Sequence, residues 1–248
     1  MPPQAREAQD HSMIGREPEA GSWKRDVRRL LVHGRDAEAA TLAVRQLRER
    51  DRSGPTEHPT QGGTMGPIEQ LDEIGPLIMQ LVDNIEADQL DDSTPCAAFT
   101  VRGVLEHMIG GATAFAAAFR GVAPADAPTN GNGGDPRQQI GVALGGLVES
   151  MRSPGALDRT IAAPFGEVPG SDFARFVALD GLVHGWDLAT ATGQSYAPND
   201  ALVAEVDAFA RAAISSDMRH GDVFGAPTEP PKGASPIERL AAFTGRRI

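Results

Sequence analysis

The feature that most limits what this chain can fold into is a helical repeat of apolar residues that opens just after Met65. In its first stretch, apolar side chains recur at steps of three and four residues, at Ile68, Leu71, Ile74, Ile78, Leu81 and Ile85. This spacing places them in one stripe along a helix, and the chain has no clear run of alternating apolar and polar residues typical of a strand. The pattern therefore predicts an all-α fold, most simply a four-helix bundle with additional C-terminal helices.

Capping and turn residues set the expected limits of the helices. Thr100 and Ser171 are candidate N-caps, Gly193 is suited to the position just after a helix, and Ser235 opens a capping box with Glu238. A short extended piece is expected within 159–168. Together these signals predict helices that begin at 66 and 235 and helices that span about 100–120, 136–152, 171–193 and 200–214.

Charge and pattern divide the chain into two unequal parts. Residues 1–64 carry a net charge of +1, whereas residues 65–248 carry −12. The first part begins as a polar segment punctuated by Pro and Gly, and it is predicted to be a mostly disordered N-terminal extension with short helices between Ser22 and Arg50. Residues 65–248 are predicted to form the helical bundle. The alternative for residues 1–64 is a partner-binding arm, and Met65 is a candidate start of the protein.

Composition excludes several classes of function. The net charge of −11 argues against nucleic acid as a partner, because phosphate binding needs a basic surface. No apolar run is long enough for a transmembrane helix, and the N-terminus lacks the apolar segment of a secretory signal. A single cysteine, Cys96, excludes an internal disulfide framework and a cysteine-cluster metal site. We expect a cytoplasmic protein without membrane or nucleic-acid partners, with a homodimer as a candidate assembly.

A carboxylate and an imidazole fall together on the apolar side of the fourth helix. On a helical wheel, Asp180 and His184 lie in the middle of a stripe that includes Phe173 and Val177. A buried carboxylate costs several kcal/mol unless it is paired or binds a metal. Because the two residues are four positions apart, their side chains lie one turn apart on the same face and can share an ion.

A second imidazole, that of His107, lies on the second helix beside small residues such as Gly103, Gly110 and Gly111. Since inward side chains of facing helices meet in a bundle, we expect His107, Asp180 and His184 to form one divalent-metal site. Two imidazoles and one carboxylate suit Zn²⁺, with Ni or Fe as alternatives. Three protein ligands also leave a position for water or substrate, which is the catalytic pattern.

Simpler interpretations of these residues remain open. Taken alone, His107 has the usual interpretation of a partly buried, hydrogen-bonded histidine at a helix boundary, and Asp180 could pair with Arg175 or Arg102. Asp187 could pair with an arginine or hold a histidine tautomer. Cys96 could approach the site or be a lone buried thiol, and His220, in a polar loop, is expected to be solvated.

Two sequence motifs resemble a known family. Residues 99–107 read F-T-V-R-G-V-L-E-H, which resembles the start W-T-V-R-D-L-L-x-H of the second helix in DinB/YfiT-like metal-binding bundles. Residues 180–194, which begin D-G-L-V-H-G-W-D-L-A, resemble the D-x-x-x-H-x-W-D-L-A-x-A-T-G motif of their actinobacterial branch. That branch is similar to the N-terminal domain of mycothiol-dependent maleylpyruvate isomerase. Its C-terminal ending also resembles residues 223–225, 236–240 and 244–246.

The resemblance implies a divalent metal held by His107, Asp180 and His184, with the shorter Asp180 standing where the isomerase pattern has a glutamate. It implies a metal-dependent thiol transferase or isomerase that activates a small-molecule thiol such as mycothiol, with Trp186 and Asp187 around the metal ligands. The alternatives are a non-catalytic protein that uses the metal pocket to bind a ligand, and a metal-dependent hydrolase that uses bound water.

Overall fold

The computed structural model describes residues 64–122, 134–163, 166–219 and 224–248. The expected short helices of the N-terminal extension and the expected solvated position of His220 lie outside these residues. The all-α prediction is confirmed, because the described residues form six α-helices and a small two-stranded sheet. The α-helices are α3 (Pro67–Asp83), α4 (Val101–Arg120), α5 (Pro136–Arg152), α6 (Gly170–Thr192), α7 (Asp200–Ala213) and α8 (Pro236–Phe243). Short 3₁₀ helices, η1 (Ala87–Asp91) and η3 (Asp217–Arg219), complete the helical elements.

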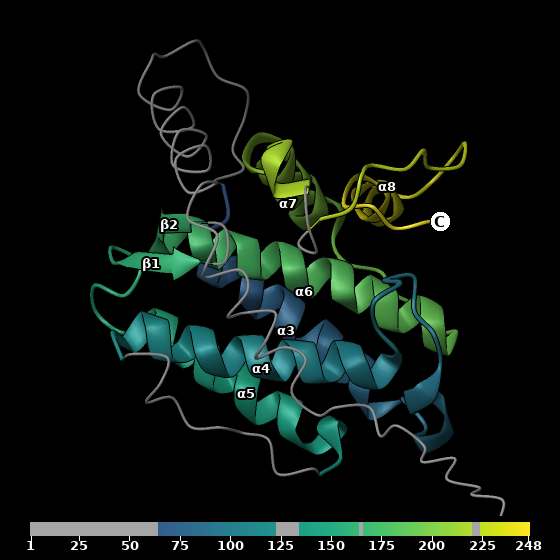
Figure 1. Ribbon diagram of the computed structural model, residues 1–248, viewed down its shortest axis with the longest axis horizontal. Helices are drawn as coiled ribbons and strands as arrows, with labels where there is room; N and C mark the ends of the chain where they lie inside the picture. Colours follow the sequence, from purple (N-terminus) through teal and green to yellow (C-terminus); the bar gives the residue numbers. More distant parts are fainter. Residues whose placement is uncertain (1–63, 123–133, 164–165, 220–223) are drawn as a thin grey trace, which may run out of the picture.

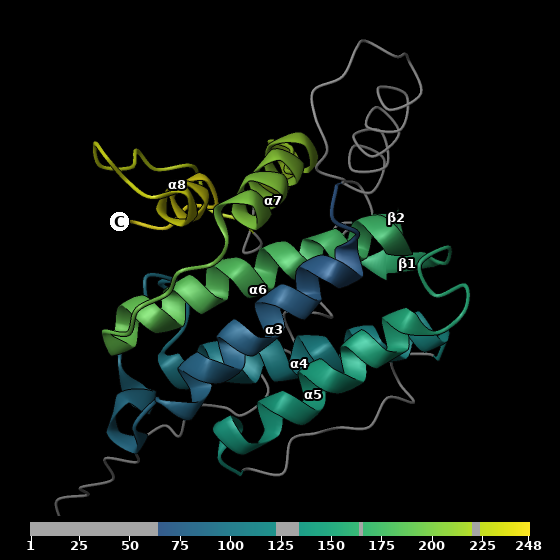
Figure 2. The same ribbon diagram turned by 180° about the vertical axis from the view of Figure 1, so that it is seen from behind.

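Four helices form the bundle, and two more cover one side of it. Helix α4 packs on α5, α3 packs on α6, and α4 also contacts α6. Helices α7 and α8 pack on α6 and on each other, beyond the bundle (Figures 1 and 2). The largest fully buried side chains come from these helices and from β1, and they are Phe119, Phe173, Ile74, Leu105, Ile140, Met151, Ile161, Leu179, Leu182, Leu188, Leu202 and Leu240.

Local capping signals place most helix ends as expected. Thr100 is the N-cap of α4, and its side chain accepts a hydrogen bond from the Gly103 N–H at 3.2 Å. The capping box of Ser235 and Glu238 opens α8. Gly193 ends α6 with a φ of 67°, a left-handed conformation that glycine adopts without steric cost. These three predictions are confirmed.

The start of α6 differs from the prediction. Ser171 is not its N-cap, because the helix begins at Gly170 and has no side-chain cap. Instead, carbonyl oxygens of the preceding loop accept the first N–H groups: Gly170 N–H donates to Arg159 O at 2.7 Å and Ser171 N–H to Leu157 O at 2.9 Å. A side chain at position 170 would begin 2.7 Å from the Ala156 carbonyl oxygen, so this close approach requires glycine.

The extended piece predicted within 159–168 is a hairpin. Strands β1 (Thr160–Ala163) and β2 (Gly166–Pro169) are antiparallel, with Thr160 opposite Pro169 and Ala163 opposite Gly166. Because β2 leads directly into α6, the hairpin fixes where that helix begins.

Helix α6 lies at the centre of the molecule. It contacts α3, α4, α7 and α8, and fifteen of its 23 residues are buried. Such a helix is apolar almost all round, because neighbours cover it on several sides. In the described part of the chain, no helix has the length and apolar character needed to cross a membrane.

Two positions on α5, two residues apart, differ in burial and can be used to test how this helix packs on the core. Ile140 is fully buried, whereas Val142 is 77% exposed. We predict that Ile140→Ala lowers the free energy of unfolding by about 2–5 kcal/mol, because it removes buried methyl groups and leaves a cavity. Val142→Ala should change it by less than about 0.5 kcal/mol. Urea unfolding of both variants checks the prediction, and equal losses would contradict this packing of α5.

Candidate metal centre

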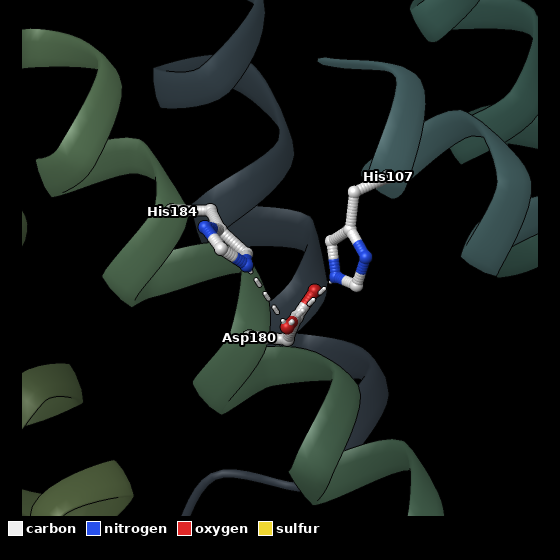
Figure 3. Close-up of side chains that lie close together, drawn as sticks. All are labelled: His107, Asp180 and His184. Carbon is white, nitrogen blue, oxygen red and sulfur yellow. Dashed lines mark ion pairs between the residues drawn. The ribbon is translucent and has the colours of Figure 1, made fainter. Parts of the chain in front are cut away.

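The site lies where α4 and α6 face each other. Asp180 and His184 project from successive turns of α6, and His107 reaches toward them from α4 (Figure 3). The structure therefore brings together the three residues that the sequence predicts as a group.

The donor atoms are spaced as ligands of one ion would be. Asp180 Oδ1 lies 3.4 Å from His184 Nε2 and 3.6 Å from His107 Nε2. All three donor atoms lie within 4.8 Å of one another. Tetrahedral ligands about 2.1 Å from one ion are about 3.4 Å apart, whereas a direct N–H···O hydrogen bond is about 2.9 Å long. The geometry can therefore hold a metal ion.

The three side chains differ in exposure. His184 is 5% exposed, whereas His107 and Asp180 are 38% and 46% exposed. The expectation that Asp180 lies in the middle of an apolar stripe is therefore correct for its neighbour His184 but not for Asp180 itself. Glycines 103, 110 and 111, on the helix that carries His107, are also only partly buried. One side of the site is consequently open to solvent.

The buried imidazole is held from behind by a second carboxylate. Nδ1 of His184 lies 3.0 Å from Oδ2 of Asp187, whose side chain has no exposed surface. Because the carboxylate can only accept a hydrogen bond, Nδ1 carries a proton. In the neutral ring, Nε2 then has its lone pair directed toward Asp180 and His107, as in carboxylate–histidine–metal arrangements.

Charges around the site shift the pKa values of its groups. Burial alone lowers the pKa of His184, but Asp180 and Asp187 outweigh it and raise that pKa to about 9 in the metal-free protein. Loss of surrounding water next to the protein raises the pKa of Asp180, yet the two histidines hold it well below its usual range. Burial also raises the pKa of Asp187, whereas His184 and Arg246 lower it to a value below the usual one. Both aspartates are therefore ionised at neutral pH.

Two further residues lie near the site. Arg246 donates to Asp187 Oδ2 at 2.9 Å, an interaction for which the sequence gives no spacing signal, since Arg246 follows the last helix. Cys96 is partly buried, and burial raises its pKa despite the nearby charge of Arg246. It is not among the grouped metal donors.

Two residues that the sequence analysis placed near the metal ligands have other contacts in the structure. Trp186 packs in the hydrophobic core. Arg102, a candidate partner of Asp180, has its Nε 3.8 Å from Oδ1 of Asp91.

The chain is therefore a helical-bundle protein with a candidate metal site, formed by two histidines and an aspartate between α4 and α6. The family model of the mycothiol maleylpyruvate isomerase N-terminal domain matches residues 71–189, which contain all three side chains. Two uncharacterized proteins of Mycobacterium tuberculosis, from strains CDC 1551 / Oshkosh and ATCC 25618 / H37Rv, are each 35% identical to the chain over 169 residues. The aligned region covers 68% of this chain and 91% of either relative. The chain belongs to the mycothiol maleylpyruvate isomerase N-terminal domain family. No solved structure matches it.

The raised pKa of His184 predicts how the stability of the metal-free protein depends on pH. The pKa is about 9 in the folded state and 6.5 ordinarily, so the folded state binds this proton more tightly. The resulting stabilisation, roughly 3 kcal/mol, is fully present below pH 6.5 and is lost as the pH rises through 9. Urea unfolding in the presence of a chelator should show this loss. His184→Gln should remove most of the dependence, and an equal decline in both proteins would refute the assignment.

Proposed function

We propose that the chain binds one divalent metal ion through His107, Asp180 and His184 and uses it to activate a small-molecule thiol, as a metal-dependent thiol transferase or isomerase. The observation that carries this proposal is the contact of Asp187 with Nδ1 of His184, which leaves Nε2 facing the other two donor atoms. Zn²⁺ is the expected metal, with Ni or Fe as alternatives, because two imidazoles and a carboxylate suit borderline divalent ions. When bound, such an ion lowers the pKa of a coordinated thiol or water and stabilises the anion.

The charges of the side chains favour an anionic ligand. Two neutral imidazoles, two aspartates and Arg246 sum to a charge of −1, so a divalent ion brings the site to +1. A thiolate would neutralise this charge, whereas a neutral ligand would leave it unbalanced in a partly buried place. Because the chain belongs to a mycothiol-related family, we propose mycothiol as the thiol that binds here.

The surroundings favour a ligand that approaches from one side. The Phe99 ring lies 5.2 Å from the His107 ring and 6.2 Å from the His184 ring, measured between centroids. It forms an apolar wall beside the donor atoms, while the exposed parts of His107 and Asp180 face solvent. We propose that the thiol enters on this open side and that Phe99 shields the sulfur from water.

The proposal has two rivals. A non-catalytic protein could use the same metal to bind a ligand, and a metal-dependent hydrolase could use a bound water. We further propose residues 65–248 as the functional domain and the cytoplasm as its location, where a lone thiol such as Cys96 stays reduced.

Metal content tests the site directly. We predict that purified protein without a histidine tag binds one equivalent of Zn²⁺, and that His107→Ala and His184→Ala each lose stoichiometric metal while most helicity remains. Cys96→Ser is the matched control, because it changes a nearby sulfur that is not among the grouped donors. Metal analysis and far-UV circular dichroism check these results. Full metal content in both histidine variants would refute the assignment.

Cobalt substitution separates the three functions. We predict that adding mycothiol to the Co²⁺-substituted protein produces a sulfur-to-metal charge-transfer band, because the thiolate coordinates the metal directly. His184→Ala should show no band. An unchanged spectrum together with turnover of an ester or amide would favour the hydrolase, and neither response would favour the non-catalytic binding protein.

A further inference from the structure

Arg246 contacts the site from a distant part of the chain. It lies in the turn that follows α8, and only 11% of its side chain is exposed. Its Nη2 donates to Asp187 Oδ2 at 2.9 Å, and its Nε lies 3.3 Å from both oxygens of the same carboxylate. The guanidinium therefore fixes both the charge and the plane of the Asp187 carboxylate.

The backbone around Arg246 holds it in this position. The N–H groups of Gly245 and Arg246 donate to the carbonyls of Ala242 and Ala241, each at 3.0 Å, which is the Schellman pattern of a helix end. Gly245 has a φ of 100°, and a side chain there would begin 2.6 Å from Cα of Gly225. The carbonyl of Arg246 also accepts a hydrogen bond from Thr228 Oγ1. Since the turn is fixed on both sides, its arginine is preorganised.

One oxygen of Asp187 joins the arginine to the candidate metal ligand. Oδ2 lies 3.0 Å from His184 Nδ1 and 2.9 Å from Arg246 Nη2. If the guanidinium were removed, the buried carboxylate would lose the partner that fixes its plane and would be free to rotate away from Nδ1. Its hydrogen bond with Nδ1 would then weaken, and His184 would lose its defined orientation toward Asp180.

We propose that Arg246 is a positioning residue of the metal site, which acts through Asp187 to hold His184 with Nε2 available to the metal. This inference rests on the proposed function. Arg246 lies outside residues 71–189, which the family model matches. In this chain, the metal site therefore depends on the C-terminal turn as well as on α4 and α6.

Metal affinity tests the inference. Metal-free wild-type protein and its variants are titrated with Co²⁺ in competition with a chromophoric chelator. Arg246→Met should weaken binding about 10- to 100-fold, the effect typical of losing a group that orients a metal ligand. Arg246→Lys should recover part of this loss, because it restores the charge without the planar fork. Arg247→Met is the matched control on the exposed neighbouring residue and should bind as the wild type does.

A second measurement does not depend on metal. In the metal-free protein, the His184 Nδ1 proton should give a slowly exchanging, far-downfield NMR signal, identified by its absence in His184→Gln. Arg246→Met should shift or broaden this signal, and Arg247→Met should leave it unchanged. Circular dichroism shows whether Arg246→Met folds. If it does not, the comparison of Arg246→Lys with the wild type decides the question by both measurements.

The outcomes separate this inference from the proposed function. If the wild type binds no metal but the Nδ1 signal responds to Arg246→Met, the proposed function fails and the positioning of His184 by Arg246 stands. If the folded Arg246→Met protein, or Arg246→Lys in its place, keeps both the wild-type affinity for Co²⁺ and the wild-type Nδ1 signal, the inference is wrong. The proposed metal site then stands without a role for Arg246. Wild-type affinity combined with weaker thiol binding would also overturn it, because Arg246 would then act on the ligand directly.

Discussion

The structure around the site depends on a single ionised carboxylate with no exposed surface. Asp187 lies in the packed interior, where an unpaired charge costs several kcal/mol. It is stabilised there by His184 on its own helix and by Arg246 from the C-terminal turn. The same two contacts orient the imidazole and fasten the end of the chain to α6. Stability and site geometry therefore come from one set of hydrogen bonds.

The position of α6 explains why such a site can exist in a small bundle. Neighbours cover this helix on several sides, so polar groups on it are buried unless a facing surface leaves them room. The side chain of Asp180 is 46% exposed, and Nε2 of His107 on α4 lies 3.6 Å from its Oδ1. On another side of α6, Gly181 allows Ile74 of α3 to approach closely. The side of α6 that carries Gly181 is therefore closely packed, whereas the side that carries Asp180 is open to solvent.

Local signals account for what could be predicted from the sequence. Helical periodicity, the Thr100 cap and the Ser235 capping box each act within a few residues, so they need no knowledge of the tertiary fold. The i, i+4 pair of Asp180 and His184 is equally local, and His107 could be added because facing helices of a bundle meet. Features that depend on contacts between segments far apart in the chain could not be predicted from the sequence. The first N–H groups of α6 donate to the carbonyls of Leu157 and Arg159, and Arg246 contacts Asp187 from 59 positions further along the chain.

The junction between Gly225 and Gly245 has a consequence for how this bundle can vary. A side chain at position 245 would begin 2.6 Å from Cα of Gly225, and one at position 225 would begin 3.2 Å from Cα of Gly245, so the last turn tolerates little change in shape. In the described part of the chain, His184 and Arg246 supply the hydrogen bonds to the Asp187 side chain, so a shortened protein that ended with α6 would keep only the one to the imidazole. Any descendant that replaced the C-terminal turn would need a new cation at the same place, or an uncharged residue at position 187. Asp187 and Arg246 are therefore expected to be kept together or replaced together in related proteins.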